Sequence, residues 1–240
     1  MIDIHCHILF GLDDGSDNIE ESVRMAQIAV NSGIKAVVAT PHSNVPNSHQ
    51  NFWCEDIANR LNQLNQRLEQ DQIPLKVFPG NEIFANGDIV EMLKTQKLLA
   101  LNNSIYPLIE FDTYERSASA YRQLEALVAE GFTPIVAHPE RYAFVHEDTN
   151  AILRMKRRGC LLQINKGSIK GSFGKSAYYI SRKMISKQLA DFVASDAHSP
   201  YMRTPFLAEA HEEVSLMSSF DYAELILNQN PAKVILNKKI

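Results

Sequence analysis

The chain has 240 residues, of which 24 are Lys or Arg and 28 are Asp or Glu, so its formal net charge is −4. This balance offers no basic surface for nucleic acid or an anionic membrane, and no apolar run approaches the ~20 residues that cross a bilayer. A chain of this length can bury one full hydrophobic core, and its composition excludes the disordered and collagen-like classes.

The N-terminus and the cysteines predict a cytoplasmic protein. Residues 1–5 lack the basic segment and apolar stretch of a secretory signal. Cys6, Cys54 and Cys160 are too few for a disulfide framework, which is typical of a reducing compartment.

A recurring unit predicts alternating helices and strands. An amphipathic stretch, a glycine and a short apolar run occur together three times, as expected for a helix, a left-handed cap and a buried strand. A further helix follows from the helical spacing of Trp53, Ile57, Leu61 and Leu64. In chain order, we expect a strand at 2–5, a helix at 22–33, a strand at 34–40, a helix over about 50–70, strands at 76–81 and 107–111, a helix at 121–131, a strand at 132–137, a helix at 151–159, and strands at 160–164 and 191–195.

About seven parallel strands with crossover helices follow from this alternation. No linker rich in Pro, Gly or Ser divides the chain, so we predict one domain over residues 1–240. The expected fold is α/β, an irregular (β/α) barrel, and a doubly wound open sheet is the alternative.

Histidines and acids follow the predicted strands, where barrel enzymes build their sites. Three histidines, His49, His146 and His211, lie elsewhere. The five histidines at strand ends are His5, His7, His42, His138 and His198, and the acids in equivalent positions are Asp13, Asp14, Glu82, Glu110 and Asp196.

The segment His5-Cys6-His7 places two imidazoles on one face of an extended strand and the thiol on the other. Taken alone this pattern is weak, and Glu82 opening a helix or His42 capping a turn would be ordinary structure. An acid inside an apolar run, such as Glu110, needs a partner if it is buried. Taken together, the set predicts a metal site.

Imidazole and carboxylate ligands without thiolate suit Mn, Fe or Zn, and the native metal stays open among these. Even if only one of Asp13 and Asp14 binds metal, nine side chains remain, which exceed what one ion can use, so we expect two or three ions, which in such clusters activate water and bind a phosphoryl group. Spacing alone does not distinguish Asp13 from Asp14.

Cys54 and Arg60 have the spacing of a cysteine-dependent phosphatase, but the segment between them lacks glycine and contains two acids. That mechanism needs backbone amides around phosphate and a thiolate of low pKa. We therefore reject a cysteine nucleophile.

Five segments together resemble the manganese-dependent bacterial protein-tyrosine phosphatases of capsule and exopolysaccharide clusters, which belong to the PHP superfamily. The likeness runs from residue 1 to about residue 206. The segments are Met1–Gly15, Ala39–His42, Gly80–Glu82, Ala137–Tyr142 and Ala194–His198.

The resemblance implies a distorted (β/α)7-type barrel with three metals in a cleft. It implies that Arg141 and Arg203 bind the phosphate, although Thr204 stands where the family tends to have proline, which leaves the role of Arg203 open. Residues 167–174 would form a wall of the cleft. The implied ligands are His5, His7, Glu82 and Asp196 for one ion; Glu82 as a bridge, with Glu110 and His138, for a second; and Asp14, His42 and His198 for a third.

The implied activity is hydrolysis of phosphotyrosine by a metal-activated hydroxide, without a covalent enzyme intermediate. The implied substrate is a tyrosine-phosphorylated protein, by family context a bacterial tyrosine autokinase that controls capsule or exopolysaccharide synthesis. The alternatives are a PHP-type histidinol phosphatase or other small-molecule phosphoesterase, an amidohydrolase, and an inactive PHP fold that serves as a binding module. Neither the exact phosphoprotein nor the oligomeric state follows from the sequence.

Overall fold

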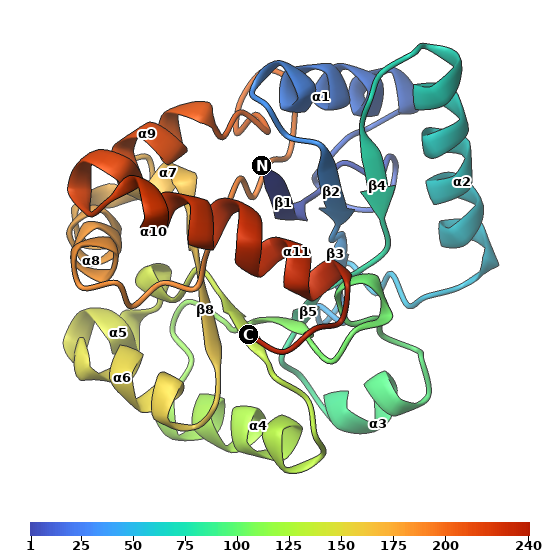
Figure 1. The fold of residues 1–240 in the computed structure, drawn as a ribbon. Helices are drawn as coiled ribbons and strands as arrows, with labels where there is room; N and C mark the ends of the chain where they lie inside the picture. Colours follow the sequence, from blue (N-terminus) through green and yellow to red (C-terminus); the bar gives the residue numbers. More distant parts are fainter.

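A computed structural model describes residues 1–240 as an α/β structure in which every strand pairing is parallel (Figure 1). One sheet has the order β1 (Ile2–Cys6), β2 (Ala36–Ala39), β4 (Lys76–Phe78). The other has the order β3 (His42–Ser43), β5 (Glu82–Phe84), β6 (Leu108–Glu110), β7 (Ile135–Ala137), β8 (Leu161–Asn165), β9 (Phe192–Ala194).

The two sheets are parts of one distorted barrel with seven strand positions. The chain of β2 continues into β3 across Pro41, and the chain of β4 continues into β5 across residues 79–81. Proline has no backbone N–H to donate, so each of these strands is interrupted at its proline. The strands predicted at 34–40 and 76–81 therefore correspond to β2 and β4, the first halves of two broken strands, and the second halves, β3 and β5, were not predicted. The predicted barrel of about seven strands is confirmed.

The barrel closes where β1 meets the segment after β9. Cys6 and Ala197 form an isolated parallel bridge, and the backbone N–H of His7 donates to the carbonyl of Ala197 at 2.8 Å. The N–H of Asp196 donates to the carbonyl of His5 at 2.9 Å. The closure thus lies at the carboxyl ends of the strands, among the predicted ligands.

A bulge in β1 turns two consecutive side chains inward. Between Asp3 and Cys6 the strand has one residue more than the facing part of β2. A bulge resets the alternation of side chains along a strand. Ile4 therefore packs in the apolar cluster inside the barrel, and the next residue, His5, also faces inward, at the polar end. Cys6 faces outward and packs in the core between strands and helices. His5 and His7 consequently share one side, as predicted.

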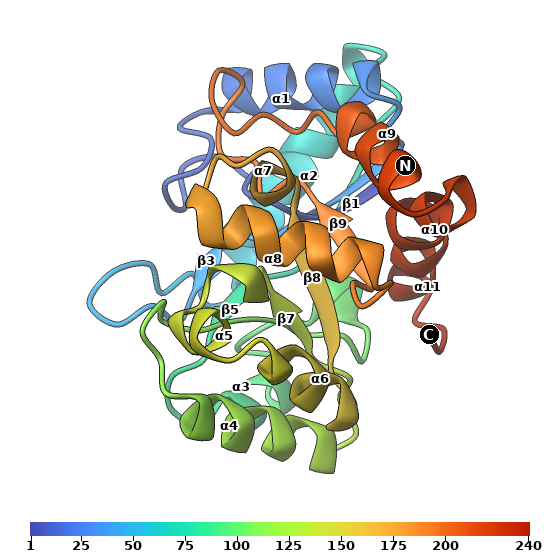
Figure 2. The ribbon, with the colours of Figure 1, turned by 90° about the vertical axis from the view of Figure 1, so that its left-hand side faces the viewer.

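Helices surround the strands on the outside (Figures 1 and 2). Gly33, Gly131 and Gly159 end three of them at φ values of +86°, +87° and +85°, which confirms the predicted left-handed caps. The helices are α1 (Ile19–Asn31), α2 (Glu55–Gln70), α3 (Ile89–Lys94), α4 (Ser117–Ala129), α5 (Ala143–Glu147), α6 (Asn150–Arg157), α7 (Lys166–Ile169), α8 (Gly174–Ser186), α9 (Ala208–Met217), α10 (Phe220–Glu224) and α11 (Asn230–Ile235).

The expected helix at 50–70 begins later, at Glu55. The preceding segment instead extends toward the site, where the side-chain amide of Asn51 donates to the carbonyls of Leu12 and His42 at 2.9 and 2.8 Å. Helices α3, α5 and α7 to α11 were not predicted.

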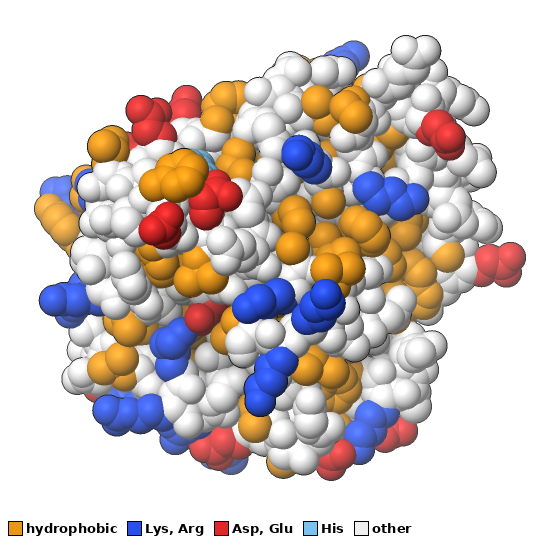
Figure 3. Space-filling view, viewed as in Figure 1, with side chains coloured by type: hydrophobic (Ala, Val, Ile, Leu, Met, Phe, Trp, Pro, Cys, Tyr) orange, Lys and Arg blue, Asp and Glu red, His pale blue; other side chains and the backbone are white.

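The barrel interior has an apolar end and a polar end. Ile4, Val38, Leu108 and Phe192 belong to an inner cluster of ten buried residues, which Val234 of α11 completes. A larger cluster of 50 buried residues lies between strands and helices. The face viewed in Figure 3 carries hydrophobic side chains beside α11 with Lys and Arg around them. The polar end, opposite α11, is left for the site.

No helix has both the length and the apolar character needed to cross a bilayer.

Candidate metal centre

All nine predicted ligands come together at the polar rim of the barrel. The strands deliver them: His5 lies in β1, His42 in β3 and Glu82 in β5, and Glu110 ends β6. The others lie in the loops that follow strands: His7 and Asp14 after β1, His138 after β7, and Asp196 and His198 after β9.

The most compact group consists of His5, His7, Glu82 and Asp196, all of them buried. The Nε2 atoms of the two histidines lie 3.3 Å apart, 3.2 and 3.3 Å from Glu82 Oε2, and 3.4 and 3.5 Å from Asp196 Oδ1. These five separations match the edges of a regular tetrahedron whose centre lies ~2.0–2.1 Å from each corner, which is the range of Zn–N and Zn–O bonds. The group therefore has the dimensions of a metal site.

The hydrogen bonds behind the two histidines leave their Nε2 lone pairs facing this centre. His7 Nδ1 lies 2.7 Å from Asp13 Oδ2, and His5 Nδ1 lies 2.9 Å from Gln163 Oε1. Because both partners are acceptors, each neutral imidazole has its proton on Nδ1. Two bare nitrogens at 3.3 Å repel each other unless a cation or protons lie between them.

A second group surrounds the two glutamates. His42 Nδ1 lies 3.0 Å from Glu82 Oε2 and 3.4 Å from Glu110 Oε2. His138 Nε2 lies 2.9 Å from Glu82 Oε1 and 3.6 Å from Glu110 Oε1. Glu82 thus touches both groups, as a bridging ligand must. His42 joins His138 here, which the sequence had not indicated.

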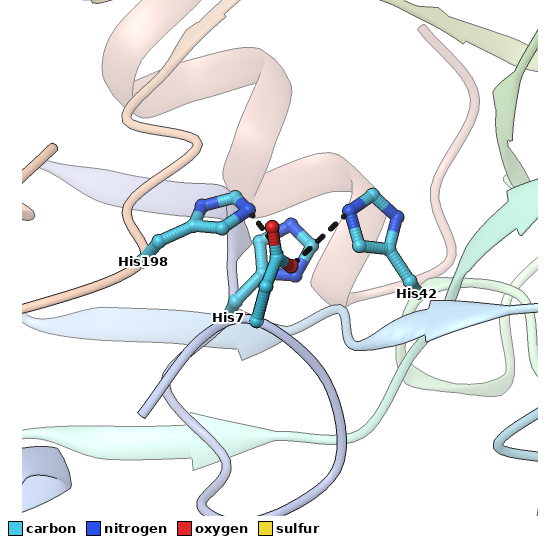
Figure 4. Close-up of side chains that lie close together, drawn as sticks. His7, His42 and His198 are labelled. Atoms are coloured by element: carbon cyan, nitrogen blue, oxygen red, sulfur yellow. Dashed lines mark ion pairs between the residues drawn. The ribbon is translucent and has the colours of Figure 1, made fainter. Parts of the chain in front are cut away.

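A third group is formed by His7, Asp14, His42 and His198 (Figure 4). Asp14 Oδ1 lies 3.4 Å from His198 Nε2 and 3.6 Å from His42 Nε2. The ring centroids of His7 and His198 are 3.9 Å apart. His42 offers one nitrogen to this group and the other to the glutamates, so it lies between two candidate sites.

Asp13 and Asp14 have different positions. Asp14 faces the third group with a side chain that is 59% exposed, whereas Asp13 is buried behind His7. Besides His7, Asp13 accepts hydrogen bonds from the backbone N–H groups of His42 at 2.7 Å and Gly15 at 3.0 Å. Asp14 therefore belongs to the cluster, and Asp13 orients it.

The charges of the cluster are coupled. Burial raises the pKa of Glu82, but attraction to His5 and His42 outweighs burial and holds it well below the usual range. Burial lowers the pKa of His42, but attraction to Glu82, with hydrogen bonds to Glu110 and Glu82, raises it to about 10. In the metal-free protein, protons on the histidines thus occupy the space between the carboxylates.

Glu82 Oε2 gives a direct test of whether a cation fits. This buried oxygen has no hydrogen-bond partner, although nitrogens of His5, His7 and His42 lie 3.2, 3.3 and 3.0 Å away. A buried carboxylate oxygen without a donor is costly. A metal ion among these atoms would satisfy it, and the donor set of nitrogen and oxygen suits Mn, Fe or Zn.

Two arginines reach the edge of the cluster. Arg203 Nη2 and Arg141 Nη1 lie 2.6 and 3.5 Å from Asp196 Oδ2, the oxygen that faces away from His5 and His7. Both guanidinium groups lie over the ring of Phe173, at 4.7 Å for Arg141 and 5.5 Å for Arg203. This arrangement brings two planar cations beside the candidate ions, where they can bind a phosphate.

Residues 167–174 border the same region. A cavity of about 240 Å³ is lined by Gly167, Ser172 and Phe173 together with Tyr201 and Arg203. The segment therefore forms a wall of a cavity that Arg203 also lines, but none of the nine candidate ligands lines this cavity.

Left-handed backbone conformations position two of the ligands. His138 has φ +33° and Asp196 has φ +49°, directly after β7 and two residues after β9. Such values are uncommon for residues other than glycine and concentrate at functional sites. They allow a side chain beyond the strand to turn back toward the barrel axis.

Sequence reasoning missed three residues near the cluster. The ring of His49 stacks on that of His42, with centroids 6.1 Å apart, although it lies in a loop far from any strand end. Gln163 and Asn165 lie in β8 and contact His5 and Asp196. Their alternation within the apolar strand Leu161–Asn165 was a readable signal, whereas His49 had none.

Cys54 precedes α2 with an exposed side chain. Arg60 donates to Asp56 at 2.9 Å and to the carbonyl of Phe10 at 3.1 Å. The guanidinium of Arg60 is thus already paired with groups other than Cys54, in keeping with the rejection of a cysteine nucleophile.

Comparison with known proteins adds a family. The sequence profile described as capsular polysaccharide synthesis, CpsB/CapC, matches residues 1–236. Tyrosine-protein phosphatase YwqE of Bacillus subtilis (strain 168) is 38% identical over 210 residues, which cover 88% of this chain and 82% of that protein. Tyrosine-protein phosphatase CpsB of Streptococcus pneumoniae is 28% identical over 245 residues, which cover 100% of both.

Solved structures agree with the barrel. One similar crystal structure belongs to a set of YwqE from Bacillus subtilis and CpsB from Streptococcus pneumoniae, which are described as unique metal-dependent tyrosine phosphatases. It superposes with a TM-score of 0.93 at 34% sequence identity, and the match covers 100% of this chain and 96% of that chain. Dihydropyrimidinase from Brevibacillus agri NCHU1002 has a TM-score of 0.56 at 11% identity, covering 98% of this chain and 70% of that chain. The second likeness shows a shared fold and says nothing about chemistry.

Proposed function

The chain belongs to the CpsB/CapC family of capsular polysaccharide synthesis, and from this premise we propose that it is a metal-dependent protein-tyrosine phosphatase, a phosphoric monoester hydrolase. The observation that carries the proposal is the convergence of nine nitrogen and oxygen ligands at one rim, beside two arginines that share Asp196. Residues 1–240 act as a single PHP-type domain.

Three ions share the ligands in this proposal. His5, His7, Glu82 and Asp196 hold the first. Glu82, Glu110 and His138, with Nδ1 of His42 close to both glutamates, would hold the second, and Asp14, His42 and His198 would hold the third. We assign manganese on the resemblance to the manganese-dependent phosphatases; the donor set without thiolate suits iron or zinc equally.

When bound, such ions would supply an activated water as the nucleophile and would offset the charge of the phosphate oxygens. Arg141 and Arg203 bind those oxygens and orient the ester, with Phe173 supporting both guanidinium groups. The leaving group is a phenolate, and since the pKa of a phenol is about 10, it needs little protonation.

We assign no cysteine to this chemistry: Arg60, the arginine that a Cys54 nucleophile would need, is already paired with Asp56 and the carbonyl of Phe10. Cys6 and Cys160 are buried, and burial raises the pKa of both thiols, to about 12 for Cys160. A thiol in that state is a poor nucleophile.

The substrate is a tyrosine-phosphorylated protein, and we assign a bacterial tyrosine autokinase of capsule or exopolysaccharide synthesis as the partner, with both proteins in the cytoplasm. The family description supports the capsule context. The second candidate is a PHP-type histidinol phosphatase or another small-molecule phosphoesterase, which the same metal cluster would serve.

Release of phosphate from a phosphotyrosyl peptide by chelator-stripped protein tests the proposal. Mn, Fe, Zn and Mg are restored separately, and histidinol phosphate is compared at equal concentration. We expect activity to return with Mn and to favour the peptide. A preference for histidinol phosphate would support the second candidate, and no turnover with any metal would indicate an inactive binding module.

A further inference from the structure

Strand β8 places two fully buried amides beside the metal cluster. Gln163 and Asn165 have no exposed surface, while Leu162 and Ile164, which alternate with them, belong to the outer core. The two amides therefore project into the barrel. None of the nine ligands comes from this strand, so the amides are available for another role.

The two amides connect His5 to Asp196 by an unbroken series of hydrogen bonds. His5 Nδ1 lies 2.9 Å from Gln163 Oε1, and Gln163 Nε2 lies 2.8 Å from Asn165 Oδ1. Asn165 Nδ2 lies 2.5 Å from Asp196 Oδ2. The backbone N–H of Asn165 also donates to Glu140 Oε1 at 3.0 Å, which fixes the strand end.

Only one direction of donation is consistent along this series. A carboxylate that binds a cation carries no proton, so Asp196 can only accept, and Asn165 must present its amide nitrogen to it. Asn165 then presents its oxygen to Gln163, whose nitrogen must donate. Gln163 therefore presents its oxygen to His5, which must donate from Nδ1.

We propose that Gln163 and Asn165 are positioning residues that set the tautomer of His5 and the orientation of Asp196, two ligands of the same ion. The inference rests on the proposed metal cluster but does not depend on which ester is hydrolysed. Neutral amides achieve this without adding another negative charge beside Glu82 and Asp196. At His7 the equivalent position is filled by a carboxylate, Asp13, at 2.7 Å.

The substitutions Gln163→Met and Gln163→Glu test the series, with the manganese dissociation constant measured by titration calorimetry in the absence of substrate. Met removes both hydrogen bonds. Glu keeps an acceptor for His5 but cannot donate to Asn165, so we expect both variants to weaken manganese binding by His5, His7, Glu82 and Asp196 by about 10- to 100-fold. A Glu variant that binds manganese as tightly as the unaltered protein, or more tightly, would overturn the proposal, since a lone acceptor would then suffice.

The double variant Gln163→Met, Asn165→Leu distinguishes a connected series from two separate contacts. If the series is connected, the double variant loses little more affinity than either single variant. Fully additive losses would contradict the proposal. Asn230→Leu, which removes a buried amide of α11 that donates to the carbonyl of Asp191 at 3.0 Å at the opposite end of the barrel, is the matched control and should leave metal affinity unchanged. Thermal unfolding of each metal-free variant shows whether it folds. If the Gln163→Met variant does not fold, the manganese affinity of the Gln163→Glu variant still tests the proposal.

Discussion

His42 and Glu82 lie directly opposite each other in the parallel pair of β3 and β5, with Nδ1 and Oε2 3.0 Å apart. Both residues come just after a proline interruption, and the backbone N–H of Glu82 donates to the carbonyl of Pro41 at 3.2 Å. The breaks in the two strands thus start a new short pair at the rim. This pair supplies two of the three side chains that each belong to more than one ligand group, the third being His7.

Glu82→Gln should remove ions from two groups at once. The amide keeps the shape of the side chain but loses the charge, and both carboxylate oxygens of Glu82 face imidazoles. We expect the metal content by mass spectrometry to fall by more than one ion, and phosphotyrosine hydrolysis to fall by about 100-fold or more. His211→Ala is the control, since His211 pairs with Glu224 away from the rim. Near-normal metal content in the glutamine variant would contradict the bridging role.

Asp13→Asn and Asp14→Asn should affect metal binding differently, the first through affinity and the second through the number of ions bound. Asp14 is a ligand in our account, so its loss should remove one ion and leave the others bound. Asp13 only orients His7 and the backbone of His42, so its replacement should weaken the metal affinity by about 10- to 100-fold without changing the stoichiometry at saturation. Titration calorimetry with manganese measures both quantities. Identical behaviour of the two variants would remove the distinction.

Arg141→Lys and Arg203→Lys should impair turnover while the metal stays bound. A lysine keeps the charge but loses the planar fork that binds two phosphate oxygens. We expect kcat/KM for a phosphotyrosyl peptide to fall by about 10²- to 10³-fold, with unchanged metal content. Arg182→Lys is matched, because Arg182 also lies over an aromatic ring, that of Tyr178 at 5.2 Å, and also pairs with an acid. A loss of metal in the first two variants would show instead that these arginines support the ligands.

Much of this site was predictable, and the missing part has a physical cause. Histidines and acids at strand ends identify the rim, because parallel strands bring their carboxyl ends to one edge. The interruptions at Pro41 and residues 79–81 were not predicted, since Pro41 directly follows the predicted strand at 34–40 and Pro79 lies inside the predicted strand at 76–81. The contacts of His49 with His42 and of Asp13 with His7 depend on loop geometry, which the periodicity of side chains does not contain.

The stability of the metal-free protein should fall as the pH rises above neutrality. The pKa of His42 is raised from 6.5 to about 10, so its contribution to folding is complete below about pH 6.5 and is lost as the pH rises toward 10. The pKa of Glu82 is lowered, so its contribution to the free energy of unfolding is present above about pH 4.5 and is lost as the pH falls further into the acid range. Thermal unfolding of chelator-treated protein should therefore show a maximum at about pH 5–6.

His42→Gln should flatten the alkaline side of this profile. In the unaltered protein, manganese affinity should rise as the pH rises from about 6.5 toward 10, because manganese ions compete with protons for the same histidine nitrogens. Stability of the metal-free protein that rises steadily from pH 6.5 to 9 would contradict the account of the coupled charges.

Anomalous X-ray scattering at the manganese absorption edge, from crystals of the manganese-loaded protein, tests the central claim most directly. Our account predicts at least two anomalous peaks, one of them bounded by His5, His7, Glu82 and Asp196 and another within reach of both Glu82 and Glu110. Crystals saturated with manganese that give no peak at this rim, or peaks only at surface carboxylates, would contradict it.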